Sequence, residues 1–517
     1  MKKKSAYSAL NRRLGTILFV AILVLAAFLR VHKLSSLPPG ISVDEAQWAL
    51  NALNASRGSL GLLFEGSSNI GFAAYIGLGA VLLWLWESVL ALRYLNAALG
   101  VVMVAGLYFW AKDSFGRRAA LLAAFLAAVS PWALTLSRNV LPINLALAAL
   151  VWLCFLAQRA YKTGKWGYSV AAALTMVAGC FSARLFWLVP VVFAVAAVVL
   201  LLQRKFVSFR KRLLVSTAVV GLLVLVPMAV LLLIGKANPA AGIVRSNVGD
   251  NTGFTVVAKA SLENAGKTVL MFFTSGDENY THNLGGVPLL NAFTALMFLL
   301  GVLLALARRS RMAYGFVGIG LTVLVLPSIV GLGVDAPDAY RAALAMPFVF
   351  MLAGIGTNHL LTRWYAMFPI NTTARSLGLS FVVLLLVLTA YQGYRQYFLA
   401  WAQDPQTFVA YREDLVEAAR YGKANQAEPY IVARPEELAV VTASRMARNA
   451  TGFGGSIEQL ESLPLANKPQ VIILLGADSS ELRALKRRVE AKFPKGSFGV
   501  NTSPFNESQL FVWYRTP

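Results

Sequence analysis

The sequence predicts a polytopic α-helical membrane protein with a small extracytoplasmic α/β domain at its C-terminal end. Hydrophobic residues make up 57% of the 517-residue chain and charged residues only 14%, whereas an average soluble domain carries about 25% charged residues. Apolar runs long enough to cross the core of a bilayer recur up to residue 394. After residue 395 charged residues become common, and the apolar runs shorten to the length of strands.

The apolar runs predict about eleven membrane-spanning helices. The first run could be a signal peptide, but it is longer than a usual signal core and Pro38-Pro39-Gly40 makes a poor cleavage site, so we expect a retained span. A crossing of 70–86 would break the parity of the spans, and Trp84 and Trp86 suit a membrane surface, so we expect an interfacial helix there. The expected spans are 14–30, 89–111, 119–136, 142–158, 167–182, 185–202, 213–234, 289–307, 312–333, 342–361 and 377–394.

Basic clusters between the apolar runs set the predicted orientation. They include Lys2-Lys3-Lys4, Arg117-Arg118, Arg204-Lys205 and Arg308-Arg309. Under the positive-inside rule these loops and the N-terminus face the cytoplasm. Because the number of predicted spans is odd, the C-terminal domain then lies outside the cytoplasmic (inner) membrane. This distribution accounts for the net charge of +23 without a nucleic-acid partner. Cys154 and Cys180 fall inside predicted spans, where we expect them to be packing residues.

The chain divides into a predicted transmembrane catalytic region, 1–394, and an α/β domain, 395–517. The first region contains two long external segments, 31–88 and 235–288. The second region contains alternating or continuous apolar runs that favour strands, and periodic stretches that favour helices. The expected strands are 430–433, 438–442, 471–475 and 510–514, and the expected helices are 406–422 and 479–493.

Before residue 395 the acids collect in the predicted external segments, and several arginines lie among them. These arginines are Arg93, Arg138, Arg184, Arg245 and Arg341. Basic residues in external turns oppose the positive-inside rule. We therefore expect an anionic ligand on that side of the membrane.

The stretch ISVDEAQWALNAL (41–53) opens a predicted helix just after the first span. Ser42 and Glu45 fit the S-x-x-E capping box, which gives Glu45 a structural role. The box does not need Asp44, whose charged form the helix dipole favours. Both acids could simply begin an interfacial helix; alternatively, Asp44 is the general base for a hydroxyl or amide acceptor.

The order of several motifs resembles the GT-C glycosyltransferases that use dolichyl- or polyprenyl-phosphate sugars. This family includes protein O-mannosyltransferases and the bacterial aminoarabinose transferase of lipid A. The motifs are Arg30, Pro39-Gly40, Asp44-Glu45-Ala46, RYLNAALG from Arg93, FGRRAALLA from Phe115, SPWALTLSR from Ser130 and DAYRAALAMP from Asp338. The resemblance covers 30–200 and extends more weakly to 360; it depends on the order of the motifs, since none is diagnostic alone.

The resemblance implies roles for individual residues. Asp44 matches the catalytic carboxylate that activates the acceptor, and Glu45 and Arg93 match supporting residues. Asn144 stands where related enzymes often carry a second acid, and since an amide cannot act as a base, a two-carboxylate metal site is less well supported. Asn69-Ile70-Gly71-Phe72 replaces the usual P-P-L before the interfacial helix, a departure at the acceptor side.

The leaving phosphate of such a donor is already a good anion, so the enzyme needs a base for the acceptor and cations for the phosphate. Arginine suits the second task through bidentate contacts. The candidates are Arg138, Arg184, Arg341 and His282, and each arginine could instead be an interfacial anchor. Asp44, Asp277, Glu278 and His282 could ligate a divalent metal, although their spacing matches no specific metal motif.

These observations predict an inverting glycosyltransferase that moves a sugar from a polyprenyl-phosphate donor to a protein, lipid or glycan acceptor on the outer face of the membrane. No cofactor is certain from these observations, and a divalent metal stays open as an alternative. The alternative from another class is a transporter or flippase of a lipid-linked anion. Transporters typically have inverted repeats and polar or broken helices at the midplane. Here the ionisable residues lie at the outer ends of the spans, which favours the enzyme.

Overall fold

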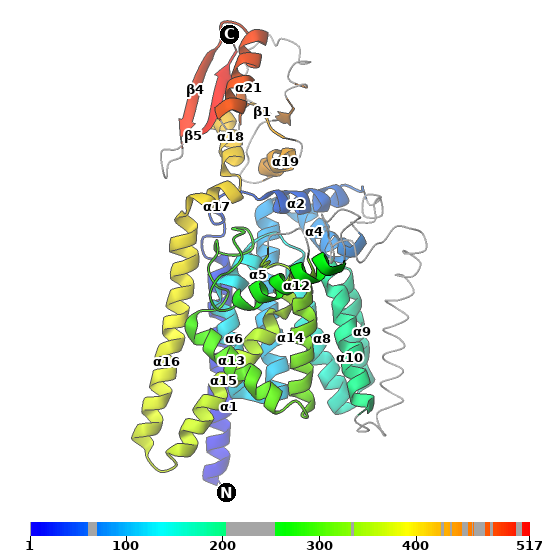
Figure 1. The fold of residues 1–517 in the computed structure, drawn as a ribbon, viewed down its shortest axis with the longest axis vertical. Helices are drawn as coiled ribbons and strands as arrows, with labels where there is room; N and C mark the ends of the chain where they lie inside the picture. Colours follow the sequence, from blue (N-terminus) through cyan, green and yellow to red (C-terminus); the bar gives the residue numbers. More distant parts are fainter. Residues whose placement is uncertain are drawn as a thin grey trace.

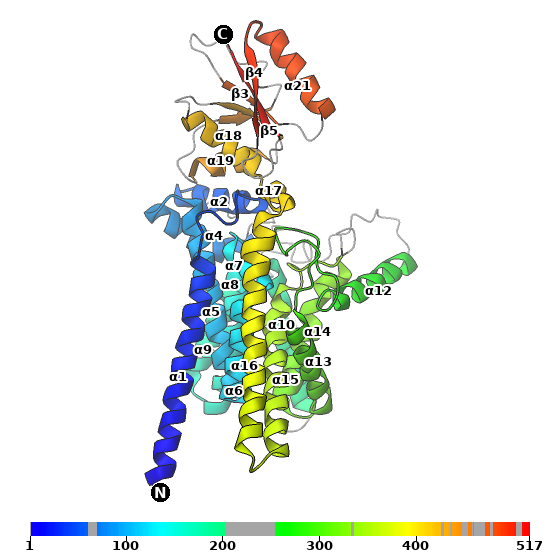
Figure 2. The ribbon, with the colours of Figure 1, turned by 90° about the vertical axis from the view of Figure 1, so that its left-hand side faces the viewer.

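A long bundle of helices carries a small sheet at one end, which we call the sheet-bearing end (Figure 1). The N-terminus lies at the opposite end of the bundle (Figures 1 and 2). The structure is a computed structural model that describes residues 2–59, 70–202, 254–331, 336–424, 429–434, 437–446, 453–456, 459, 471–475, 479–502 and 509–516. The predicted span 213–234, Arg245 and parts of both long external segments lie outside the described residues.

Each predicted span within the described residues coincides with a helix or a bent pair of helices. They are α1 (Lys2–Val31), α5 (Val89–Phe115), α6 (Arg117–Val129), α7 (Pro131–Arg138), α8 (Ile143–Thr163), α9 (Trp166–Cys180), α10 (Leu188–Leu202), α13 (Ala292–Ala307), α14 (Met312–Val330), α15 (Met346–Met367) and α16 (Thr372–Arg395). The fold class is therefore confirmed. By length and composition, six spans in the described part of the chain could cross a membrane, or seven with the bent pair α6–α7. This is fewer than predicted because 213–234 lies outside the described residues and because α9, α10 and α13 have only 15, 15 and 16 residues.

A bend between α6 and α7 and a close contact between α13 and α15 shape the bundle. The axes of α6 and α7 meet at 59°, because Pro131 begins α7 and Ser130 caps it. Helices α13 and α15 touch through their backbones: a Cβ on Gly301 would lie 2.1 Å from the Leu352 carbonyl oxygen. Small residues are what allow such a close approach between helices in a membrane.

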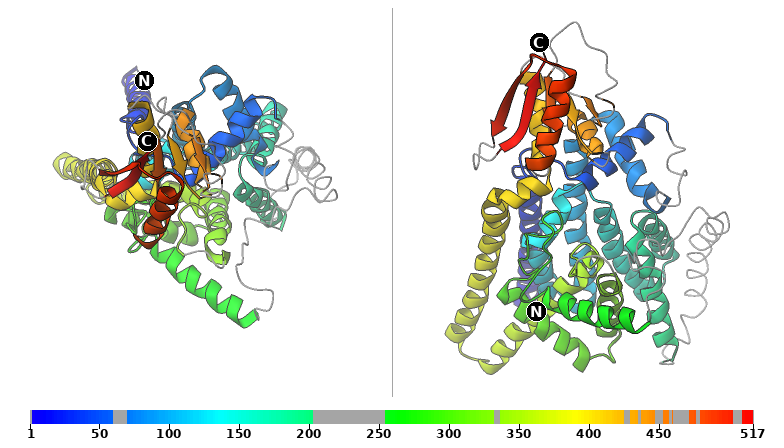
Figure 3. Two further views of the ribbon diagram at one scale, coloured as in Figure 1. Left: turned by 90° about the horizontal axis from the view of Figure 1, so that it is seen from above. Right: turned by 45° about the horizontal axis from the view of Figure 1, so that its top comes forward.

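The helices at the sheet-bearing end connect the bundle to the C-terminal part of the chain. Helix α2 (Val43–Ser56) lies across this end, next to α4 (Ala73–Leu85) (Figures 1 and 3). With 13 residues, α4 is too short to span a bilayer core, in agreement with the predicted interfacial helix. The apolar face of α2 shares one buried cluster with α18 (Glu413–Ala424) and α19 (Leu438–Met446). The other helices near this end are α12 (Phe254–Leu270) and α17 (Pro405–Ala410).

The sheet has the strand order β2-β1-β3-β5-β4. Its strands are β1 (Tyr430–Val432), β2 (Phe453–Gly455), β3 (Val471–Leu474), β4 (Ser497–Thr502) and β5 (Gln509–Arg515). Strands β2, β1 and β3 are parallel, and β5 runs antiparallel to both β3 and β4. Helix α21 (Ser479–Lys492) follows β3.

Comparison with the sequence predictions gives three correct strands and one error. The strands expected at 430–433, 471–475 and 510–514 are present as β1, β3 and β5. The strand expected at 438–442 is wrong, because this segment forms α19, whose buried Val440 and Ala443 face the cluster around α2. The helix expected at 406–422 is broken into α17 and α18, and Arg412 between them has a φ of 46°. Strands β2 and β4 were not predicted.

Candidate active site

The start of α2 separates the two neighbouring acids. The Ser42 hydroxyl accepts a hydrogen bond from the Glu45 amide at 3.2 Å, and the Glu45 carboxylate accepts one from the Ser42 amide at 3.4 Å. This is the predicted capping box. Glu45 is completely buried, whereas Asp44 is exposed. Among the described residues, none forms a hydrogen bond or ion pair with the Asp44 carboxylate.

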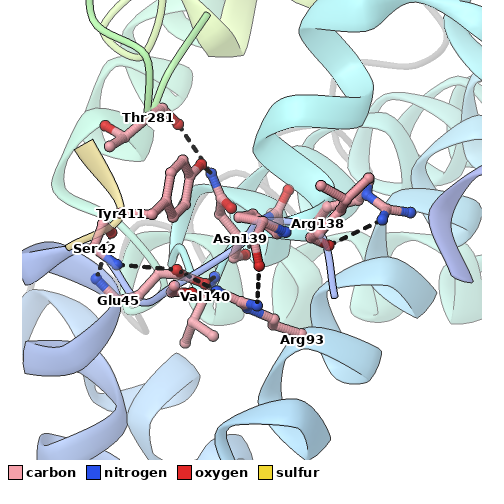
Figure 4. A network of polar contacts seen from close by, with 12 residues as sticks. Ser42, Glu45, Arg93, Arg138, Asn139, Val140, Thr281 and Tyr411 are labelled. Carbon is pink, nitrogen blue, oxygen red and sulfur yellow. Dashed lines mark hydrogen bonds and ion pairs between the residues drawn. The ribbon is translucent and has the colours of Figure 1, made fainter. Parts of the chain in front are cut away.

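Glu45 has a second role that the sequence did not reveal. Arg93 of α5 binds both of its carboxylate oxygens, with Nε at 3.0 Å and Nη2 at 2.8 Å (Figure 4). The Val140 amide donates to the same carboxylate at 2.9 Å. Arg93 also donates to the carbonyl oxygens of Pro38 and Gly40, at 3.2 and 2.6 Å. This buried ion pair fastens the segment before α2 to the bundle, and it occupies the Arg93 guanidinium.

Arg138 is also occupied by the protein. Its side chain is completely buried. Its nitrogens donate to the carbonyl oxygens of Leu29, Arg30 and Leu37 at 2.8–3.0 Å, and to the Tyr397 hydroxyl at 3.1 Å. All three guanidinium nitrogens thus have acceptors. The position of Arg138 therefore does not support the prediction that it binds a donor phosphate; it joins α7 to the end of α1.

Two buried asparagines complete this network. Asn144 donates to the Asn96 side chain at 2.9 Å and to the Leu136 carbonyl oxygen at 2.7 Å, so it holds the turn between α7 and α8. Asn139 donates to the Thr281 carbonyl oxygen at 2.9 Å and to the Tyr411 hydroxyl at 2.6 Å (Figure 4). The polar residues beneath α2 therefore serve to position backbone.

A second group of polar side chains lies in the loops that precede α13 and α15. Asp277, His282 and Asp338 bring one ligand atom each to within 4.8 Å of one another. The Asp277 carboxylate accepts hydrogen bonds at 2.8 Å from the amides of Asn279 and Ala339. Burial raises the pKa of Asp277 to about 6, although these two amides act in the opposite direction.

This group changes the predicted set of metal ligands. Asp277 and His282 come together, but with Asp338 in place of Asp44 and the exposed Glu278. One imidazole nitrogen and two carboxylate oxygens suit Zn²⁺ or Mn²⁺. Ligand atoms about 2.1 Å from a shared ion lie at most about 4.2 Å apart. A small side-chain movement would therefore close the group around an ion, so the residues fit a divalent cation.

Tyr340 connects this group to Asp44. Its ring stacks on His282 with the centroids 5.0 Å apart. Burial raises the pKa of Tyr340, and the charges of Asp44 and Asp338 raise it further, while Arg184 lowers it. Tyr340 thus lies within electrostatic reach of residues from α2, from the helical turn η2 (Arg184–Trp187) and from its own loop. Segments that are far apart in the sequence, namely α2, η2 and the loop before α15, thus contribute to one site.

The two remaining arginine candidates border this site. Arg184 is half-buried, and its guanidinium lies 5.4 Å from the centre of the Phe72 ring. Arg341 pairs through Nε with Asp338 at 3.2 Å. Its Nη1 is buried and has no hydrogen-bond partner in the described part of the chain. An unsatisfied buried donor is costly, and an anionic ligand oxygen would satisfy it.

Sequence reasoning missed Tyr340 and assigned no role to Asp338. Both belong to the DAYR sequence, of which only Arg341 was used. Asp338 and Tyr340 belong to the site only because they contact the loop at 277–282, which is distant in the sequence. The placement of an acid and an arginine on either side of a tyrosine in DAYR was the available signal.

Comparison with known proteins identifies the fold. The chain superimposes over 97% of its length on 97% of ArnT from Cupriavidus metallidurans bound to undecaprenyl phosphate, with a TM-score of 0.55 and 14% identity. The chain has the GT-C glycosyltransferase fold. In addition, 85% of the chain matches 64% of the oligosaccharyltransferase AglB from Archaeoglobus fulgidus, in complex with an inhibitory peptide and a dolichol-phosphate (TM-score 0.51, 16% identity). The chain thus spans less than two thirds of AglB.

Sequence comparison agrees with the GT-C fold. Residues 72–231 match the family described as dolichyl-phosphate-mannose-protein mannosyltransferase. No curated protein matches the sequence. The family match and the GT-C fold support the predicted glycosyltransferase and do not favour the transporter.

Proposed function

We propose that this GT-C protein is an inverting glycosyltransferase that moves a sugar from a polyprenyl-phosphate donor to a nucleophilic acceptor at the sheet-bearing end. The family match at 72–231 and the lipid phosphates bound by ArnT and AglB support this donor class. In this proposal residues 1–394 form the catalytic region and 395–517 a separate α/β domain. The acceptor is a protein, lipid or glycan.

The observation that carries the proposal is the division of labour between Asp44 and Glu45. Glu45 is buried and bound by Arg93, while Asp44 is an exposed carboxylate in the first turn of α2. Asp44 accepts the proton of the acceptor as the acceptor attacks the sugar, and the phosphate leaves with the electron pair of the broken bond.

The charge that grows on the leaving phosphate requires cations. Arg341 offers its buried Nη1, and Arg184 lies within electrostatic reach of the neighbouring Tyr340. Both stabilise the phosphate as its negative charge develops. Asp277, His282 and Asp338 would hold a divalent cation, which when bound supplies further positive charge for the phosphate.

The orientation follows from the basic residues at the end opposite the sheet. Arg117 and Arg118 at the start of α6 lie there, as do Arg308, Arg309 and Arg311 between α13 and α14. Under the positive-inside rule this end faces the cytoplasm. The site beside Asp44 then faces the outside of the cytoplasmic membrane.

Sugar transfer by the purified protein tests the proposal. We expect transfer from polyprenyl-phosphate sugars by the wild type, and a loss of about a hundredfold or more in Asp44→Asn, as for the removal of a general base. Glu87→Gln is the matched control, because Glu87 is an exposed acid that makes the same change from carboxylate to amide. Unchanged transfer in Asp44→Asn would refute the assigned base. Absence of transfer by the wild type with every donor, together with lipid movement in proteoliposomes, would favour the flippase.

A further inference from the structure

Two adjoining cavities lie at the end of the bundle opposite the sheet, far from Asp44. The first, which we call the basic cavity, has a volume of about 560 Å³ and lies between the ends of α5, α14 and α15. Its polar lining consists mainly of Arg308, Arg311, Tyr314, Asn358, His359 and Arg363. Ligand sites in proteins commonly have volumes of about 300–1,000 Å³.

The basic cavity concentrates positive charge without a balancing acid. Arg308 donates to the Tyr314 hydroxyl at 3.1 Å. Within the described residues, none of Arg308, Arg311 and Arg363 forms an ion pair with an acid, and no acid lines this cavity. The nearby Asp113 is neutralised by Arg159, at 2.6 Å. A concave site lined by one sign of charge attracts a ligand of the opposite sign.

The second cavity, which we call the apolar cavity, has a volume of about 300 Å³. Most of its lining is apolar and includes Trp110, Cys154, Phe193, Ala196 and Phe316. Asp113, Gln158 and Lys162 also line it, and the Asp113 carboxylate is paired with Arg159. Ser114 and Ala313 line both cavities, so the two adjoin at these residues. A ligand that fills both must have an anionic part and a hydrocarbon part next to each other.

We propose that the two cavities together bind an anionic phospholipid. Its phosphate headgroup lies among Arg308, Arg311 and Arg363, and one acyl chain enters the apolar cavity. Basic pockets between helices on the cytoplasmic side of membrane proteins bind anionic headgroups in this way. The inference does not depend on the proposed transfer reaction, because the cavities lie at the other end of the bundle. The simpler explanation is that the arginines only attract the charged membrane surface.

Native mass spectrometry of the full-length protein in neutral detergent distinguishes these explanations. The protein is titrated with phosphatidylglycerol, with phosphatidylcholine of the same acyl chains, and with glycerol phosphate. We expect phosphatidylglycerol to bind at least about tenfold more tightly than either of the others, since only this lipid matches both cavities. This comparison uses the wild type and does not depend on the folding of any variant.

Variants locate the site. The double variant Arg311→Gln/Arg363→Gln should weaken phosphatidylglycerol binding by about 25-fold, at about fivefold per arginine. Arg309→Gln is the matched control, since Arg309 is exposed in the same loop but does not line either cavity; we expect less than about a twofold effect. If the double variant and Arg309→Gln lose phosphatidylglycerol affinity equally, binding depends only on surface charge and the proposal is overturned. Equal binding of glycerol phosphate and phosphatidylglycerol would overturn the lipid and leave a phosphate site.

Discussion

Replacement of Glu45 by glutamine tests the buried network beneath α2. Glu45→Gln keeps the size of the side chain but removes its charge and one acceptor. The Glu45 carboxylate accepts from Arg93 twice, from the Val140 amide and from the Ser42 amide. In the variant, the NH₂ group of the glutamine side chain faces one of these N–H donors and cannot accept a hydrogen bond from it. Arg93, only 5% exposed, then has no counter-charge.

The expected loss of stability follows from this burial. Removal of one partner from a buried ion pair costs about 3–5 kcal/mol, because the other charge stays buried and unpaired. Arg93 keeps its hydrogen bonds to Pro38 and Gly40, so we expect the lower end, about 3 kcal/mol. Glu87 provides the matched control, since it pairs with Arg57 at the same distance of 2.8 Å but on the surface. Glu87→Gln should cost less than about 1 kcal/mol.

The free energy of unfolding, measured in mixed micelles by tryptophan fluorescence, gives the test. The double variant Glu45→Gln/Arg93→Met should recover part of the loss, because it no longer buries an unpaired charge. Equal effects of Glu45→Gln and Glu87→Gln would refute the reasoning. So would a double variant whose loss is simply the sum of the two single losses.

Three further predictions concern the site and the bundle. Arg341→Gln should weaken donor binding about tenfold, as for a lost charged hydrogen bond, and it should lower the free energy of unfolding through the loss of its pair with Asp338. Arg138→Gln should lower the free energy of unfolding but leave donor affinity in the folded protein unchanged. Donor titration and unfolding curves separate the two variants, and equal donor affinity in both would contradict the assignment. Because Asp277 becomes neutral as the pH falls through about 6, its affinity for Zn²⁺ or Mn²⁺ should fall over the same range. Conversely, the stabilisation that the neutral Asp277 gives the metal-free protein should be lost as the pH rises through about 6. Equal affinities for the metal in calorimetric titrations at pH 5 and 7.5 would refute the raised pKa. Gly301→Val should cost about 2 kcal/mol or more by forcing α13 from α15, whereas Gly318→Val, with open space around it, should be tolerated in thermal unfolding.

Local features of the fold could be read from the sequence. The spans depend on runs of apolar residues, and the capping box depends on two residues three positions apart. Both signals lie within one element. The pair of Glu45 and Arg93, by contrast, joins residues 48 positions apart. Arg138 gave the same signal as Arg341, a cation at the outer end of a span, and only their acceptors distinguish a structural residue from a ligand residue.

The errors have the same origin. The segment 438–442 is rich in valine, which favours a strand, but it forms α19 because its apolar residues cover α2. The predicted metal group differs from the observed one for a similar reason, since it included Asp44 and Glu278 and lacked Asp338. Asp277 and His282 share a loop, yet the loop that brings Asp338 to them begins far along the chain. Contacts between distant segments override local preference in both cases.

The apolar cluster that α2 shares with α18 and α19 makes the position of Asp44 a property of the whole chain. Gly40, just before α2, is so close to the C-terminal part that a Cβ there would lie 2.1 Å from the Tyr411 carbonyl oxygen. A chain cut after α16 would leave in water the apolar residues of α2 that pack on α18 and α19, and it would deprive Asn139 of the Tyr411 hydroxyl. Screens for inactive variants should accordingly recover substitutions in α18 and α19 that never touch a substrate, because they dislodge the helix on which the proposed base stands.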